Sequence, residues 1–173
     1  MEFIQKTNKE NDAVTAIIYA SRGKTYKENE AVSAIINVSR GKTYRAEDLD
    51  GILVYKEKKI IGLGLYYIKN NECEIVLMET FIQNKGIGTQ LIQKIKEIAE
   101  KEKCKRIWLI TTNENINAIR FYQKRGFHLS NIYINALEES RKIILEIPKM
   151  EDGIEIRDEI EFEMILWNGW HIV

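Results

Sequence analysis

A strand-turn-helix pattern at residues 72–99 constrains the fold more than any other part of the sequence. Residues 72–79 read as a strand, and a short polar turn with Gly86 and Gly88 follows. After this turn, apolar side chains recur at helical spacing. These side chains are Ile87, Leu91, Ile92, Ile95, Ile98 and Ala99. The pattern predicts a strand that leads into an amphipathic helix, with two glycines at the start of the helix.

The two glycines indicate a candidate phosphate site. The first backbone N–H groups of a helix have no acceptor within the helix, and the helix dipole favours a negative charge there. A glycine lets a ligand approach these groups because it has no β-carbon. Taken alone, Gln83-x-x-Gly86-x-Gly88 fits a simple tight turn equally well. It lacks the Gly-Lys-Ser/Thr of a P-loop and the third glycine of a dinucleotide-binding fingerprint.

A second strand-turn-helix pattern ends at residue 127. A strand leads into an asparagine-rich turn, and a short helix then begins near Asn115 and stops at Gly126. Asparagine is a favoured N-cap residue, so Asn115 is suited to start this helix. Tyr122 lies within the helix beside Phe121, and it could simply be a packed aromatic side chain.

Together, the two patterns resemble a known family. Gln83-x-x-Gly86-x-Gly88, followed by Asn115-x-x-Ala118-x-x-x-Tyr122-x-x-x-Gly126-Phe127, is similar to the paired motifs of GNAT-type N-acetyltransferases. The resemblance covers residues 48–134. It implies an α/β (α+β) fold with a single mixed, mostly antiparallel sheet flanked by helices. It also implies an enzyme that moves an acetyl group from acetyl-CoA to a primary amine of a small molecule or a protein.

The resemblance also assigns roles to residues of the two motifs. The glycine turn would hold the pyrophosphate of acetyl-CoA through backbone N–H groups, and the backbone near Met78 would bind the pantetheine arm. Tyr122 would lie near the CoA sulfur, where a phenol with a pKa of about 10 can donate a proton at neutral pH. Lys85 could contact phosphate or be an ordinary solvated lysine. The expected cofactor-binding residues are Met78, Gln83, Lys85, Gly86, Ile87, Gly88, Thr89 and Asn115.

The general base is sought among the glutamates of the strand that should border the substrate. Glu74 is the candidate, acting directly or through water, with Glu72 and Glu79 as neighbours on the same strand. Each of the three could instead be a solvated strand glutamate. The acceptor pocket could be lined by Ser39, Arg40 and Tyr44.

A near repeat occupies residues 13–48. Ala13–Tyr26 recurs eighteen residues later as Ala31–Tyr44. Two copies are too few for a solenoid, so we interpret residues 13–30 and 31–48 as a local duplication whose first copy is an insertion. Each copy fits either a short helix that ends before its glycine or a strand that enters a glycine turn. The family resemblance favours helices here, next to the acceptor site.

The remaining sequence predicts further strands of one sheet. Residues 51–55, 60–68 and 72–79 should form an antiparallel meander, with Gly62 and Gly64 on one face of its middle strand. Residues 156–167 should close the sheet. There, apolar residues alternate with Glu159, Glu161 and Glu163, which is typical of a half-exposed strand.

Length and composition predict one domain over residues 1–173 and exclude several classes of protein. A formal net charge of zero argues against a basic nucleic-acid-binding surface. There is neither an apolar run of membrane-spanning length nor a signal peptide, so we expect a cytoplasmic protein that does not bind membranes. The two cysteines and two histidines form no metal-ligand pattern, so no metal is expected.

A second function remains open at this stage. The same fold could serve as a non-catalytic module that binds acyl-CoA or a partner protein. The acidic strand near the C-terminus, together with Trp167 and Trp170, could form a homodimer or partner contact.

Overall fold

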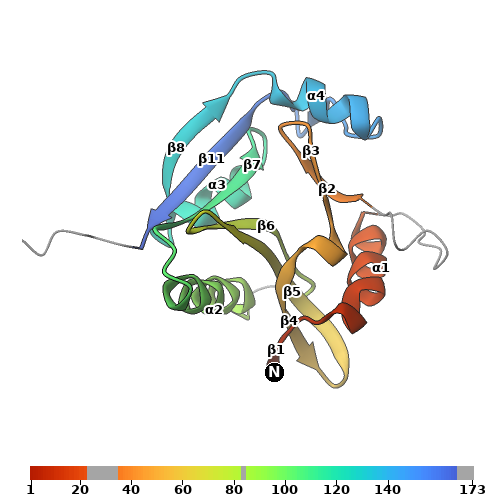
Figure 1. Ribbon diagram of the computed structural model, residues 1–173. Coiled ribbons are helices and arrows are strands. Elements are labelled where there is room, and N and C mark those ends of the chain that lie inside the picture. Colours follow the sequence, from red (N-terminus) through yellow and green to blue (C-terminus); the bar gives the residue numbers. More distant parts are fainter. Residues whose placement is uncertain (23–34, 83–84, 167–173) are drawn as a thin grey trace, which may run out of the picture. The chain divides into compact units, whose positions relative to one another are not determined.

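The computed structural model describes residues 1–22, 35–82 and 85–166 (Figure 1). Seven strands form one sheet in the order β1-β4-β5-β6-β7-β11-β8. The assigned strand pairs are antiparallel except that β6 and β7 run parallel. The strands of this sheet are β1 (Glu2–Gln5), β4 (Asp50–Lys56), β5 (Lys59–Lys69), β6 (Glu72–Thr80), β7 (Arg106–Thr112), β8 (His128–Tyr133) and β11 (Glu159–Ile165).

Four α-helices, two small hairpins and two short 3-10 helices (Asn8–Glu10 and Ala46–Asp48) complete the described structure. The helices are α1 (Asn11–Ser21), α2 (Ile87–Lys101), α3 (Ile116–Gln123) and α4 (Ala136–Ile143). The hairpin strands are β2 (Ile35–Ser39) with β3 (Lys42–Arg45), and β9 (Met150–Glu151) with β10 (Ile154–Glu155). The mixed, mostly antiparallel sheet flanked by helices confirms the predicted fold class. Both strand-turn-helix patterns are confirmed as β6-α2 and β7-α3.

The chain forms two compact units. The first unit comprises residues 1–37, 43–67 and 76–95, and the second comprises residues 38–42, 68–75 and the chain from residue 96 onward. Strand β6 and helix α2 each contribute residues to both units.

In the first unit, helix α2 packs on the glycine face of β5. A β-carbon on Gly62 would lie 2.9 Å from Ile87 Cγ2, and one on Gly64 would lie 3.1 Å from Ile95 Cδ1. Real β-carbons almost never show the first distance and rarely show the second, and Ile87 and Ile95 are themselves fully buried. The two glycines therefore allow the apolar stripe of α2 to contact the sheet directly.

Both copies of the near repeat contribute side chains to a second core cluster of this unit. Val14 and Ile18 of α1 pack in one cluster with Ile36 of β2 and Tyr44 of β3. The described part of the first copy is therefore a core helix, and its interpretation as an insertion stays a prediction. The second copy forms the β2-β3 hairpin, so the expectation of a helix there is wrong. Residues 23–34, which end the first copy and begin the second, lie outside the described residues, as do Trp167 and Trp170.

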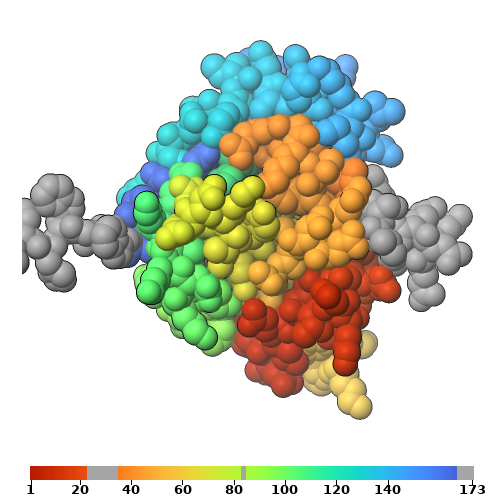
Figure 2. All heavy atoms as spheres, viewed as in Figure 1, coloured from red at the N-terminus to blue at the C-terminus, as the bar shows by residue number. Residues whose placement is uncertain are grey.

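In the second unit, the sheet separates apolar from charged side chains. Ile107, Leu109 and Phe162 are buried on one face, while Arg106 of β7 and the glutamates of β11 lie on the other. Figure 2 shows β8 and α4, coloured cyan to blue, at the molecular surface.

Within the described residues, no helix is long and apolar enough to cross a membrane. Over the same ranges, no cluster of three or more histidine, cysteine or acidic side chains could hold a metal ion.

Candidate functional site

Five glutamates share one face of the strands in the second unit. Glu72 and Glu74 of β6 are in register with Arg106 and Trp108 of β7. Because antiparallel partners point to the same side, the β7-β11 register adds three residues of β11 to this face. We call this surface the acidic face and define it by Glu72, Glu74, Glu159, Glu161 and Glu163.

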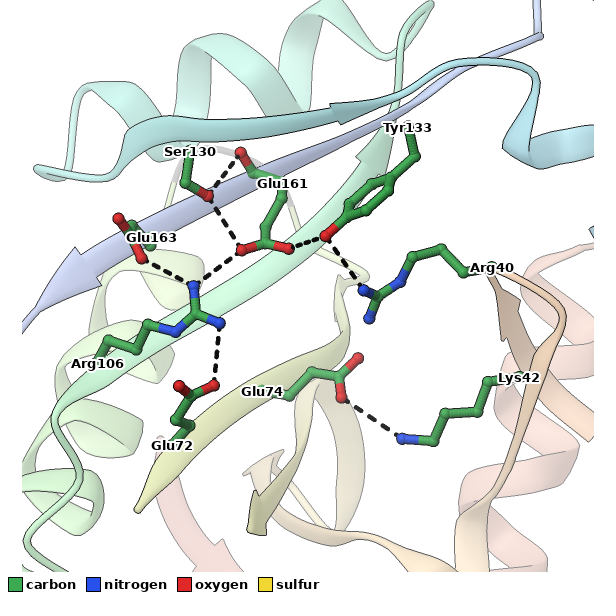
Figure 3. A network of polar contacts seen from close by, with 9 residues as sticks. All are labelled: Arg40, Lys42, Glu72, Glu74, Arg106, Ser130, Tyr133, Glu161 and Glu163. Atoms are coloured by element: carbon green, nitrogen blue, oxygen red, sulfur yellow. Dashed lines mark hydrogen bonds and ion pairs between the residues drawn. The ribbon is translucent and has the colours of Figure 1, made fainter. Parts of the chain in front are cut away.

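Arg106 ties three of these carboxylates together (Figure 3). Its Nη1 donates to Glu161 Oε1 at 2.9 Å and to Glu163 Oε2 at 2.8 Å, and its Nη2 donates to Glu72 Oε2 at 3.0 Å. Burial alone would lower the pKa of Arg106, but the three carboxylates raise it above its usual range. The guanidinium is therefore a permanent charge in the middle of the face.

Glu161 is buried and receives several hydrogen bonds. Tyr133 Oη donates to its Oε2 at 2.6 Å, and Ser130 Oγ donates to its Oε1 at 3.1 Å. Burial favours the protonated acid, but the donors from Tyr133, Arg106 and Ser130 outweigh it and hold the pKa of Glu161 below its usual value. The carboxylate is thus ionised at neutral pH.

The turn of the β2-β3 hairpin contacts the acidic face at Glu159, the first residue of β11. Ser39 Oγ donates to Glu159 Oε2 at 3.0 Å, and the Arg40 N–H donates to the same oxygen at 3.1 Å. Arg40 and Gly41 both have positive φ, at 49° and 71°, which is the combination that a two-residue type I′ hairpin turn requires. The left-handed conformation costs a residue such as Arg40 about 1–2 kcal/mol, and the bonds to Glu159 offset it.

Two glutamates of β11 are buried rather than half-exposed. Glu159 is 2% exposed and Glu161 is 5% exposed, so the prediction of a half-exposed strand is wrong for this face. Burial raises the pKa of Glu159, although its bonds to Ser39 and Arg40 act in the opposite direction.

Glu74, the candidate base, is also buried rather than solvated, with 6% of its surface exposed. Its Oε2 lies 3.7 Å from the Lys42 ammonium at the end of the hairpin turn. Glu72 instead bonds to Arg106. Glu79 belongs to the first unit, where burial raises its pKa against the opposing effects of Ser21 and Arg22. Glu74 is thus the member of the three that lies buried on the acidic face.

The glycine turn lies in the first unit and opens α2. Gly86 has a φ of 69°, and its carbonyl oxygen accepts the Gln90 N–H at 3.1 Å. Lys85 and Thr89 are exposed, while Ile87 and Gly88 are buried. Among the remaining expected cofactor-binding residues, Met78 is partly buried on β6, and Gln83 lies outside the described residues.

Asn115 and Tyr122 lie on α3 in the second unit. Asn115 Oδ1 accepts the Ala118 N–H at 3.0 Å, which confirms the predicted N-cap. The Tyr122 ring packs edge to face on Phe121 and Phe127, with centroid distances of 5.2 and 5.5 Å. Burial raises the pKa of Tyr122, so the phenol keeps its proton at neutral pH. Packing and proton donation are therefore compatible for this side chain.

Sequence reasoning missed several residues of the acidic face. No local motif in the sequence marks Arg106 and Trp108, which share strand β7, or Tyr133, which ends strand β8. The available signal was the alternation of glutamates in β11, combined with the strand register that brings them beside Arg106.

Comparisons with known proteins identify the family of this chain. The model of the Acetyltransferase (GNAT) family matches residues 18–127. The uncharacterised protein YdhI of Bacillus subtilis (strain 168) is 47% identical over 122 residues, which cover 69% of this chain and 76% of YdhI. A spermine/spermidine N(1)-acetyltransferase of the same strain is 34% identical over 88 residues, or 44% of this chain and 58% of that protein. Among solved structures, a GNAT family acetyltransferase from Elizabethkingia anophelis with acetyl-CoA bound is 29% identical, with a TM-score of 0.61. That match covers 69% of this chain and 77% of the other.

Proposed function

Because the chain belongs to the Acetyltransferase (GNAT) family, we propose that it transfers an acetyl group from acetyl-CoA to a primary amine of a small molecule or a protein. The observation that carries this proposal is the Gly86 turn, which opens α2 with positive φ and leads into the first N–H groups of a helix. The acetyl-CoA bound to the similar Elizabethkingia protein supports the choice of cosubstrate. We place the reaction in the cytoplasm, where acetyl-CoA is available.

The cofactor roles follow from this proposal. Backbone N–H groups of the turn would hold the pyrophosphate, with Gln83, Lys85 and Thr89 at its edges. Gly86, Ile87 and Gly88 supply the backbone of the turn itself. The backbone at Met78 and the N-cap at Asn115 would hold the pantetheine arm. No metal is needed for this chemistry.

Catalysis would need one base and one acid. Glu74 accepts a proton from the acceptor ammonium, directly or through water. The neutral amine nitrogen then attacks the thioester carbonyl carbon, the C–S bond breaks, and the CoA thiolate takes the proton of Tyr122. The amide nitrogen loses its extra proton to solvent, and solvent returns a proton to the Tyr122 phenolate. Two observations support these assignments: Glu74 is buried on the acidic face, and the phenol of Tyr122 still carries its proton at neutral pH.

Two measurements test the proposal. Acetyl-CoA should raise the midpoint of thermal unfolding because it binds only the native state. Acetyl-CoA with a panel of primary amines should release free CoA thiol. Binding without release for any amine would favour the alternative function, a non-catalytic acyl-CoA-binding or partner-binding module. The absence of binding at millimolar acetyl-CoA would contradict both functions.

The substitution Glu74→Gln tests whether Glu74 itself is the general base. We expect turnover to fall about 100- to 10,000-fold, with little change in the affinity for acetyl-CoA. Glu72→Gln is the matched control, because Glu72 lies two residues away on the same face but bonds to Arg106. An equal loss in both variants would mean that the charge of the face, and not Glu74 itself, matters.

A further inference from the structure

The Arg40 guanidinium lies between two aromatic rings of the second unit. Its Cζ is 5.2 Å from the ring centroid of Trp108 and 4.9 Å from that of Tyr133. Its Nη1 donates to Tyr133 Oη at 3.2 Å. Aromatic faces attract cations through the ring quadrupole, so this is a two-ring cation cage.

The buried carboxylate of Glu161 accepts a hydrogen bond from the hydroxyl group of Tyr133, whose ring belongs to the cage. Tyr133 Oη donates its proton to Glu161 Oε2 at 2.6 Å, so its lone pairs face the Arg40 N–H group (Figure 3). The phenol oxygen is therefore a hydrogen-bond acceptor that a carboxylate polarises, and it can serve any N–H cation. Nothing in this arrangement is specific to an arginine of the same chain.

The hairpin turn does not depend on the Arg40 side chain. The bonds to Glu159 come from the Ser39 hydroxyl and from the backbone N–H of Arg40. The bond between the guanidinium and Tyr133 is exposed to solvent, which weakens it. The guanidinium can therefore leave the cage while the turn stays in place.

The surrounding charge favours a second cation when the guanidinium leaves. The acidic face holds five carboxylates, and three cations lie near it, namely Arg40, Lys42 and Arg106. Arg106 is already bonded to three of the carboxylates. Even if Glu159, whose pKa is raised by burial, is counted as neutral, the carboxylates outnumber these three cations. Departure of the Arg40 guanidinium therefore leaves the surroundings of the cage more negative.

We propose that Trp108, Tyr133 and Glu161 form a cation subsite in which Arg40 stands in for a charged group of the acceptor. The acceptor class is then an amine that carries a second cationic nitrogen, either an alkylammonium or a guanidinium, away from the amine that is acetylated. This inference rests on the proposed function for its acceptor, but the cage itself can be tested by binding alone.

The test uses two Arg40 variants of the full chain. Arg40→Asn removes the cation and gives the turn an Asn-Gly pair, which a type I′ turn prefers. Arg40→Lys keeps a cation on the turn. The ligands are 1,4-diaminobutane and agmatine, which carry a second cation, and butylamine, which does not. Binding is measured by titration calorimetry without acetyl-CoA.

We expect Arg40→Asn to raise the affinity ratio of 1,4-diaminobutane to butylamine about tenfold, which corresponds to a cage that Arg40 occupies about 90% of the time. The Arg40→Lys ratio should stay closer to that of the wild type. Comparison of agmatine with 1,4-diaminobutane shows whether the cage prefers a guanidinium or an ammonium. In the Arg40→Asn background, Trp108→Leu should remove the gain, and Trp108→Phe should keep part of it if leucine impairs folding.

An unchanged or lower ratio in Arg40→Asn would overturn the inference, since Arg40 would then not compete with the ligand. A gain that survives both Trp108 substitutions in folded protein would also overturn it. The release of CoA thiol is scored separately, so failure of acetyl transfer with intact diamine binding would contradict the proposed function and leave the cage standing.

Discussion

Ile18 and Ile36 occupy equivalent positions in the two copies of the near repeat, yet one lies on helix α1 and the other on strand β2. Both side chains are fully buried, and both belong to the same core cluster of the first unit. Nearly identical segments therefore adopt different secondary structures because each buries its isoleucine against the same neighbours. Tertiary packing overrides local propensity here.

This relationship predicts that both copies are needed for stability. Ile18→Ala and Ile36→Ala should each lower the free energy of unfolding by about 2–5 kcal/mol, because each leaves a cavity in a packed core. Urea unfolding monitored by circular dichroism measures the loss. Ala20→Ser on the exposed side of α1 is the control and should change stability by less than about 0.5 kcal/mol. A negligible effect of Ile18→Ala alone would favour the interpretation of the first copy as an insertion.

Glu159 should make the wild-type protein less stable as pH rises. Its folded pKa is raised by burial, so its stabilising contribution is complete below pH 4.5 and is lost as pH rises through the folded value. Glu159→Gln cannot titrate, and its amide oxygen can still accept from Ser39 and Arg40.

We therefore expect the unfolding free energy of Glu159→Gln to be flatter than that of the wild type from about pH 4.5 to pH 8. Urea unfolding at several pH values measures this slope. The exposed Glu138→Gln is the control and should retain the wild-type slope. If Glu159→Gln also retains it, the carboxylate does not titrate in this range.

The stability that Arg106 provides through Glu161 should depend on pH in the opposite direction to that of Glu159. Glu161 has a lowered pKa, so its contribution to stability is present above pH 4.5 and is lost as pH falls through the folded value. Without Arg106, the buried carboxylate loses a charged donor, and its pKa should rise.

The loss of unfolding free energy in Arg106→Gln should thus be about 1–3 kcal/mol at pH 7 and smaller near pH 4. Arg106→Lys keeps the charge without the planar geometry that joins three carboxylates, and it should be intermediate. A loss that does not depend on pH would show that packing of the Arg106 side chain, rather than ionised Glu161, explains the effect.

The local parts of the fold could be read from the sequence, but the acidic face could not. The β6-α2 pattern, the Asn115 N-cap and the strand alternation in β11 each depend on residues within a few positions of one another. The burial of Glu159 depends on Ser39 and Arg40, which lie about 120 positions earlier in the chain. For the second copy of the repeat, the local sequence fits a helix and a strand equally well, so only long-range packing decides which of the two forms.

Tyr122→Phe tests the proposed acid. The substitution keeps the ring that packs on Phe121 and Phe127, so stability should change by less than about 1 kcal/mol. Turnover should fall about 100- to 10,000-fold if Tyr122 protonates the thiolate, with little change in the affinity for acetyl-CoA. Steady-state rates of CoA release and a binding titration measure the two effects. Equal turnover in a variant whose chemistry limits the rate would leave Tyr122 with its packing role alone.

Gly88→Val should abolish acetyl-CoA binding while most of the fold remains. Gly88 lies in the first turn of α2, where a ligand oxygen must come within about 2.7–3.2 Å of a backbone N–H. A branched β-carbon would stand between donor and phosphate. Valine has a higher helix propensity than glycine, and the buried Leu91 and Ile95 are unchanged, so α2 should still pack. Because Gly88 is itself buried, Gly88→Ala provides a smaller substitution that should weaken binding less. Circular dichroism beside a binding titration separates folding from affinity, and a folded Gly88→Val protein with wild-type affinity would mean that the phosphates bind elsewhere.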